Sequence, residues 1–394
     1  MPGLTRFRAT HNTEVQSFTC PVCSATLYYE NSVCVACQTP VAYARAERAF
    51  VALTDDLTPC VNLDLNGCNW LPEVAGAECF ACSLTRTRPA DSDLEGLPQY
   101  YRAEQSKRRL LHELDGLGLP VQRKEDDDSP GVIFDLLSSV GENVITGHAD
   151  GVITLDLAEG DTLHREEVRL QLGEAYRTLL GHFRHEIGHY YWTVLVEGRD
   201  EDAFRAMFGD ERADYQAEID RHYSEGPPAD WAERYVSEYA TMHPWEDWAE
   251  TFAHVLHIRD ALDTAHHFGL AVDPSIGVRR FSDVVIGTWL PMSTAFNQIN
   301  RSLGQDDIYP FVLPPAVIDK LDRVHSLIAA EGERRRSAEL AAVTGEDVAQ
   351  AGAAAPGQTV TEADAAAAAE GTGAETMDPK PMQQQQFQAA EQQV

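Results

Sequence analysis

The stretch H-F-R-H-E-I-G-H-Y-Y-W, residues 182–192, decides how the rest of this chain is interpreted. It contains the pattern H-E-x-x-H, formed by His185, Glu186 and His189. On an α-helix, side chains four residues apart share one face with Cβ atoms about 5–6 Å apart, so two such imidazoles can bind one Zn²⁺. Glu186 would then face the open side of the metal and take a proton from a zinc-bound water. The pattern predicts hydrolysis of a peptide bond.

A short motif of this kind also occurs by chance, on helices whose histidines are simply packed or exposed. Two neighbouring features favour the metal site. Residues 172–196 carry apolar side chains at helical spacing, which predicts a helix that presents the motif. Gly188 lies inside the motif, where a missing side chain allows another backbone to pack closely.

A third metal ligand is available in H-P-W-E-D-W-A-E-T-F-A-H, residues 243–254. Pro244 is expected to open a helix, because proline is tolerated in a first turn. Glu246 and Glu250 would then share one face. We expect Glu246 to complete a His₂Glu site and Glu250 to accept the free ring N–H of a zinc-bound histidine, and the reverse assignment stays open. A solvated acidic face is the alternative, but neighbouring bulky rings such as Trp248 prefer burial.

With both motifs considered, the chain resembles the gluzincin branch of zinc metallopeptidases. It is more similar to a bacterial family of zinc-binding metallopeptidases with an N-terminal zinc ribbon. The resemblance covers residues 20–330 and is carried by C…GCNW…CFACSLTRT, TGHADGVITLDLAEGD, YRTLLGHFRHEIGHYYW, FGDERADY, HYSEGPPADW and HPWEDWAETFAHVLHI. It implies a zincin-like fold and a peptide or protein substrate. It also implies that Tyr239, seven residues before Glu246, donates a hydrogen bond to the oxyanion formed during hydrolysis. A core tyrosine is the alternative.

All eight cysteines lie between residues 20 and 82. The first four form two C-x-x-C pairs separated by ten residues, which predicts a closed structural zinc ribbon over residues 18–50. The second four have looser spacing and predict a second Cys₄ module over residues 51–92, with free buried cysteines as the alternative. The expected cofactors are therefore one catalytic and two structural Zn²⁺. The two ligand sets are Cys20, Cys23, Cys34 and Cys37, and Cys60, Cys68, Cys79 and Cys82.

The formal net charge is −32, which argues against a nucleic-acid partner because phosphates would be repelled. The N-terminus lacks an apolar signal region and no run of eighteen apolar residues occurs, so neither secretion nor a membrane is expected. Clustered C-x-x-C pairs fit a reducing compartment, and the cytoplasm follows. The ribbons are expected to brace the peptidase domain or to dock a protein partner.

The remaining chain predicts an α+β fold, in which small β zinc modules precede a helix-dominated peptidase domain over residues 93–338. Residues 94–117 predict a helix whose Lys107, Arg108 and Arg109 form a solvated face. An Asp-Gly turn at residues 150–151 predicts a hairpin, and we expect an edge strand after it to bind extended substrate. The strand residues proposed for this role are Val152, Ile153, Thr154 and Leu155; an ordinary sheet strand is the alternative.

The termini complete the predicted organisation. Residues 1–17 are expected to be flexible, and residues 339–394, rich in Ala, Gln and Glu, to be a disordered tail. Two other functions stay open. One is a non-enzymatic zinc scaffold with a vestigial metal site, and the other is hydrolysis of a non-peptide amide.

Overall fold

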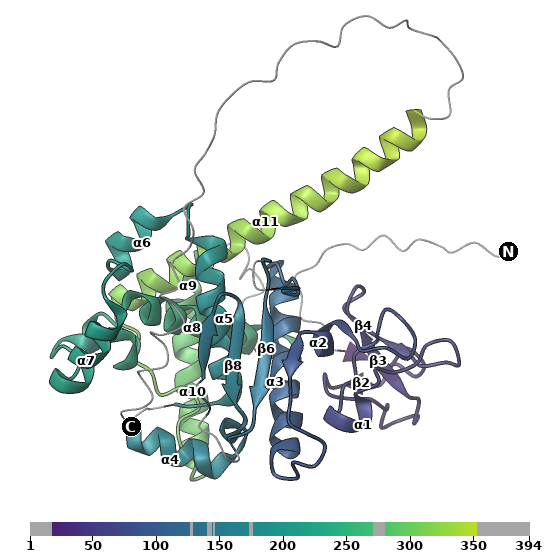
Figure 1. Cartoon of the computed structure of the whole chain (residues 1–394), viewed down its shortest axis with the longest axis horizontal. Helices are drawn as coiled ribbons and strands as arrows, with labels where there is room; N and C mark the ends of the chain where they lie inside the picture. The colour runs from purple at the N-terminus through teal and green to yellow at the C-terminus, as the bar shows by residue number, and fades with distance from the viewer. Residues whose placement is uncertain are drawn as a thin grey trace, which may run out of the picture.

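The computed structural model describes residues 18–126, 129–139, 144, 146–172, 176–270 and 280–352. Small β modules lie at one end of the molecule and a helix-rich domain at the other, with the main sheet and α3 in between (Figure 1). This confirms the predicted fold class. The flexible N-terminus expected at residues 1–17 and most of the expected tail, residues 353–394, lie outside the described residues.

The N-terminal module consists of two short antiparallel hairpins. Strand β1 (Phe18–Thr19) pairs with β2 (Thr26–Leu27), and β3 (Val41–Ala44) pairs with β4 (Ala49–Ala52). Two C-x-x-C pairs lie in the tight turns of this module. The backbone N–H of Ser24 and of Gln38 closes the respective turn by donating to the carbonyl four residues earlier, and both residues have φ of 61°.

The second cysteine module is joined to the first by backbone hydrogen bonds. Its two helical turns are α1 (Leu63–Asn66) and α2 (Phe80–Ser83). Tyr43 of β3 donates its N–H to the carbonyl of Asn69 at 2.7 Å and accepts the N–H of Leu71 at 2.8 Å. The two modules therefore form one continuous N-terminal unit.

A four-stranded sheet with the order β5-β6-β8-β7 begins the helix-rich domain. The parallel strands are β5 (Thr85–Thr87), β6 (Ile133–Leu137) and β8 (Val152–Asp156), and β7 (Gly147–Ala149) runs antiparallel to β8. Helix α3 (Gly96–Leu117) supplies the crossover from β5 to β6 that parallel neighbours require.

The hairpin predicted at Asp150 and Gly151 is confirmed, because both residues have positive φ, 47° and 79°, and connect β7 to β8. The same turn contradicts the prediction that the strand after it lies at the edge of the sheet. It folds β7 onto β8, so Val152, Ile153 and Thr154 are paired with β6 on one side and with β7 on the other. Within the described sheet, β5 and β7 are the outer strands.

The helices after the sheet build the body of the domain, and α5 and α8 form its centre (Figure 1). The bounds are η1 Leu157–Gly160, α4 Thr162–Leu172, α5 Leu179–Leu195, α6 Glu201–Phe208, α7 Tyr215–Glu225, η2 Trp231–Glu233, η3 Tyr239–Thr241, α8 Pro244–His267, α9 Phe281–Val284, η5 Val285–Trp289, α10 Leu290–Ser302 and α11 Pro315–Gly352. Among the described helices, none combines the length and apolar character that crossing a bilayer requires.

Two expectations about helices need correction. Lys107 and Arg108 of α3 are 0% and 3% exposed, so of the three basic residues only Arg109 lies on a solvated face. Helix α11 continues to Gly352, because the Ala- and Glu-rich start of the predicted tail also has high helix propensity.

Candidate metal centre

Helix α5 presents the H-E-x-x-H motif from a firmly anchored start. Thr178 caps the helix by accepting the N–H of Gly181 on its Oγ1 at 3.0 Å. His185, Glu186 and His189 all lie on the buried side, each less than a tenth exposed. The helix predicted from the apolar spacing is confirmed, although it begins at Leu179 rather than near residue 172, where α4 ends.

Helix α8 brings the predicted carboxylates to α5. Pro244 occupies its first turn, as expected, and the Nδ1 of His243 accepts the N–H of Trp245 at 3.1 Å. The two helices meet at Gly188, where an added Cβ would lie 3.1 Å from the Cα of Ala249. Trp248 locks this contact by donating its Nε1–H to the carbonyl of Gly188 at 2.8 Å. The glycine inside the motif therefore permits the approach of the second helix.

Three donor atoms from the two helices converge. Nε2 of His185 lies 3.0 Å from Oε2 of Glu246 and 3.2 Å from Nε2 of His189. Nε2 of His189 lies 3.5 Å from the same carboxylate oxygen. Bonds of 2.0–2.1 Å to a tetrahedral Zn²⁺ would separate such donors by about 3.3 Å. These residues fit one zinc ion and could hold it.

Glu250 bonds to a histidine of this centre rather than joining the converging donors. Its Oε1 accepts the Nδ1–H of His185 at 2.9 Å, and its Oε2 accepts the hydroxyl of Ser237 at 2.7 Å. A bond of this kind fixes the ring orientation and leaves Nε2 available to a metal. The geometry favours Glu246 as the ligand over the reverse assignment that the sequence left open.

Tyr215 also contacts the centre, although no role was predicted for it. Its hydroxyl donates to Oε1 of Glu246 at 2.8 Å, and the side chain is buried. Asp214, directly before it, caps α7 by accepting the N–H of Ala217, so the cap fixes the position of Tyr215. Tyr215 lies within one of the strings that carry the family resemblance, but no spacing rule links it to Glu246, which lies 31 residues away.

The two carboxylate oxygens of Glu186, which directly follows His185 on α5, differ in their partners. Its Oε1 lies 3.3 Å from Nε2 of His182, one turn earlier on α5. Its Oε2 is buried and has no hydrogen-bond partner among the described residues. Burial acts against ionisation, but His182 and His185 outweigh it and hold the pKa of Glu186 below its usual value. The side chain is therefore a carboxylate with one free oxygen.

Two further side chains flank the donors. The ring centroids of Tyr239 and His185 are 5.7 Å apart. Burial, together with the charge of Glu246, raises the pKa of the Tyr239 phenol well above its usual value. The phenol therefore keeps its proton and can donate. His148 of β7 stacks on His189 with ring centroids 6.3 Å apart, and its Nε2 accepts the N–H of Gly151. Strand β7, not β8, is thus the strand beside the donors.

The carboxylates around the centre favour the charged form of His185. Burial disfavours charge on His185, but Glu246 and Glu250 outweigh it and raise the pKa of His185 well above its usual value. The pKa of Glu246 is held well below its usual value against the effect of burial, mainly by His189 and His185. A metal ion would replace the proton between the imidazole and the carboxylate, so metal binding is expected to release a proton.

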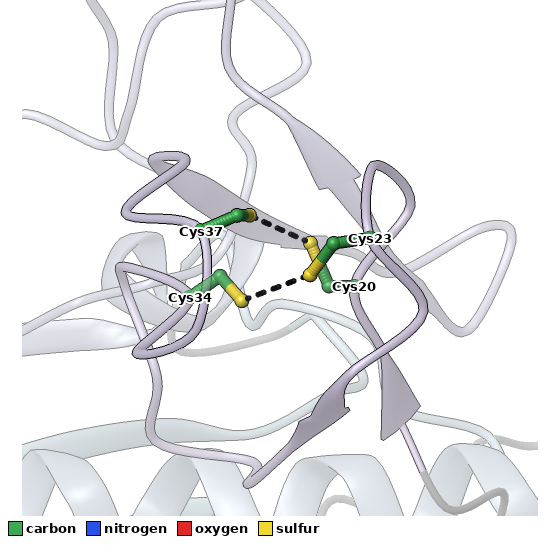
Figure 2. Close-up of side chains that lie close together, drawn as sticks. All are labelled: Cys20, Cys23, Cys34 and Cys37. Carbon is green, nitrogen blue, oxygen red and sulfur yellow. Dashed lines mark hydrogen bonds between the residues drawn. The ribbon is translucent and has the colours of Figure 1, made fainter.

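The eight cysteines form the two predicted groups of four. In the first, two sulfur pairs, Cys20 with Cys37 and Cys23 with Cys34, are 3.6 and 3.7 Å apart (Figure 2). Because zinc–sulfur bonds are 2.3 Å long, a tetrahedral Zn²⁺ would separate the sulfurs by about 3.8 Å. The sulfurs fit such an ion, and all four lie within 4.8 Å of one another.

The second group fits zinc equally well but is buried. Cys60 and Cys82 are 3.7 Å apart at sulfur, and Cys68 and Cys79 are 3.4 Å apart. All four are at most 2% exposed, whereas Cys23 of the first group is exposed. The alternative of unrelated buried cysteines does not fit this convergence.

The chain thus combines two Cys₄ groups with a helix-rich domain in which His185, His189 and Glu246 could hold a metal ion, and this arrangement is that of a zinc-binding protein. The chain belongs to the family described as "Putative zinc-binding metallo-peptidase", whose model matches residues 96–327. A zinc-ribbon domain model matches residues 17–93. Uncharacterised proteins of Mycobacterium tuberculosis and Mycobacterium bovis are 48% identical over 326 residues, which cover 80% of this chain and 95% of each relative. No solved structure matches the chain.

Proposed function

We propose that this protein is a zinc-dependent peptidase in which His185, His189 and Glu246 hold the catalytic ion. The observation that carries the proposal is the convergence of these three donors beside a carboxylate, Glu186, that has a free buried oxygen. A buried polar oxygen without a partner costs free energy, so its retention favours a chemical role. This favours the peptidase over the zinc scaffold.

The ion would supply Lewis-acid polarisation and lower the pKa of a bound water to about 7. Glu186 is assigned to accept the proton of that water on its free oxygen, and later to deliver it to the leaving amine. Tyr239, which stays protonated, is assigned to donate to the developing oxyanion of the substrate carbonyl. Glu250 and Tyr215 orient the imidazole and the carboxylate that bind the ion.

The substrate is proposed to lie along β7 (Gly147–Ala149). This strand is the outer strand next to β8, and its His148 packs on His189, so an extended peptide paired with it would run past the metal donors. A peptide recognised through backbone hydrogen bonds also fits β7 better than a small non-peptide amide, which offers no strand to pair.

The zinc content separates a loaded centre from an empty one. We expect elemental analysis to find three zinc ions per wild-type chain and two in His185→Ala, because only the His₂Glu centre loses a ligand. His266→Leu, at the far end of α8, is the control and should keep all three. Two ions in both the wild type and His185→Ala would contradict the proposed centre and support the scaffold.

The peptidase activity is tested with Glu186→Gln against a proteome-derived peptide library. The amide cannot accept the proton, so cleavage is expected to fall by at least about 100-fold while all three zinc ions are retained. An unchanged set of cleaved peptides would contradict the role of Glu186. Failure of the wild type to cleave any peptide would contradict the proposed function.

A further inference from the structure

His182 is the only histidine of the 182–192 stretch that the proposed mechanism does not use. It lies four residues before Glu186 on α5, so the two side chains occupy the same helix face. Its Nε2 lies 3.3 Å from Oε1 of Glu186, and the side chain is 16% exposed. The Thr178 cap holds the first turn of the helix in place and with it the backbone of His182.

A second carboxylate, that of Glu159, also interacts electrostatically with His182. Both oxygens of Glu159 bond to Arg177, at 2.5 and 3.1 Å. The imidazole therefore contacts the one carboxylate that the proposed mechanism needs as a base.

We propose that His182 is a positioning residue for Glu186, an inference that rests on the proposed function. A carboxylate only accepts hydrogen bonds, so in the proposed pairing Nε2 of His182 carries the hydrogen and donates it to Oε1 across their separation of 3.3 Å. This bond leaves Oε2, which has no partner, as the oxygen that accepts the proton from water. His182 itself touches neither the ion nor the substrate.

The bond matters because the terminal torsion of a glutamate is broad and has no sharp preference. Without a fixed partner, the Glu186 carboxylate would rotate between orientations, of which few present a free oxygen to the reacting water. Misplacement of a catalytic group by about 1 Å can lower a rate by about 100-fold. An ordinary pair four residues apart on a helix, which would support only helix stability, is the competing explanation.

Three variants of His182 distinguish the two explanations, because their side chains differ in whether a donor can extend to Glu186. In His182→Gln the amide nitrogen can occupy nearly the place of Nε2, in His182→Asn it is too short, and in His182→Leu there is no donor. We expect kcat to fall at least about 10-fold in the Leu and Asn variants, with KM and zinc content unchanged, and to stay within about 3-fold of wild type in the Gln variant. His266→Leu is the matched control, because α8 places it far from the donors.

A spectroscopic measurement tests the contact without any activity. In protein labelled with ¹⁵N-histidine, the ring nitrogens of His182 are expected to report the Nε2–H tautomer, and Glu186→Ala should relax this preference. An Nδ1–H tautomer in the wild type would overturn the proposal.

The kinetic outcomes are also distinct. Wild-type kcat in His182→Leu, or equal losses in the Leu and Gln variants, would overturn the positioning role while leaving the peptidase intact. A wild type that cleaves no peptide would overturn the proposed function, and the positioning role of His182 with it.

Discussion

The two Cys₄ groups have the same ligands but opposite surroundings. The first lies between two short hairpins, where Cys23 is exposed, and Val22 and Val35 beside its cysteines are 61% and 71% exposed. The second is covered on all sides, with Cys68 and Cys79 at 0% exposure. Four thiolates outweigh the charge of one Zn²⁺, so both loaded groups are anions. Water can screen the first, whereas the protein itself must balance the second.

Helix α3 supplies the positive charge that balances the second cysteine group. Arg108 donates to the carbonyl of Asn66 at 3.1 Å, and the amide of Asn66 points to the sulfur of Cys82 at 3.8 Å. Burial disfavours the charge on Arg108, but Cys68 and its neighbours raise its pKa above the usual value. The buried Lys107 adds a second cation near this group and pairs with Glu104 at 2.6 Å. Both modules share one core with the helices, so the difference lies in how the charge of each group is balanced: by side chains of α3 at the second group, and by water at the exposed Cys23 of the first.

The same helix reaches the metal centre. Glu113 of α3 accepts from Arg184 at 2.8 Å, and Arg184 directly precedes His185 on α5. Helix α3 therefore contacts both the second cysteine group and the helix that carries the H-E-x-x-H motif. These contacts fit the bracing expected of the zinc modules, and the docking of a protein partner stays a prediction.

One serine substitution in each group tests the difference between the two groups, and it is expected to have the largest effect on stability. We expect Cys68→Ser to lose one zinc ion and to lower the free energy of unfolding of the peptidase domain by at least about 3 kcal/mol, because folding and metal binding are coupled at the buried group. Cys23→Ser should also lose one ion but cost on the order of 1 kcal/mol. Zinc analysis with thermal unfolding measures both. Equal destabilisation by the two variants would contradict the distinction.

Substitutions of two neighbouring cations on α3 test whether the buried positive charge near the second group stabilises the fold. Lys107→Met removes the cation closest to buried Glu104, which keeps the Thr85 hydroxyl and the more distant Arg108 at 3.8 Å, and is expected to cost about 3–5 kcal/mol. Arg109→Met is the matched control: Arg109 is half exposed and pairs with Glu30 at the surface, so about 0–1 kcal/mol is expected. Denaturant unfolding of both variants checks the difference. A neutral Lys107→Met would mean that the buried charge balance is unimportant.

Substitutions of two consecutive tyrosines are expected to have the smallest effect on the free energy of unfolding. Tyr29 accepts from Trp70 at 2.8 Å and donates to the carbonyl of Arg108 at 2.9 Å, so it joins the two modules and α3. Tyr29→Phe leaves the buried Nε1–H of Trp70 unsatisfied and removes a second donor to the Arg108 carbonyl, so it is expected to cost about 1–3 kcal/mol. Tyr28 is 59% exposed, and Tyr28→Phe should stay within about 0.5 kcal/mol of wild type. A similar melting temperature for both variants would argue against this junction.

Much of the candidate site could be predicted because it depends on local spacing. Residues four apart on a helix share a face whatever surrounds them, so His185 with His189, and Glu246 with Glu250, were correctly paired. The Asp-Gly turn and Pro244 at the start of α8 are local signals of the same kind. The cysteine groups were also predicted, because C-x-x-C turns bring their sulfurs together before any long-range folding.

The sequence by itself therefore determined the fold class, the cysteine groups and the two helical residue pairs from which the candidate metal ligands come. Only the tertiary structure decided that β8 is paired on both sides, that Lys107 and Arg108 are buried, and that Tyr215 bonds to Glu246. The physical reason is the range of the interaction. Helical and turn geometry is fixed by bonds within a few residues, whereas strand order and the burial of charge depend on which distant segments pack together.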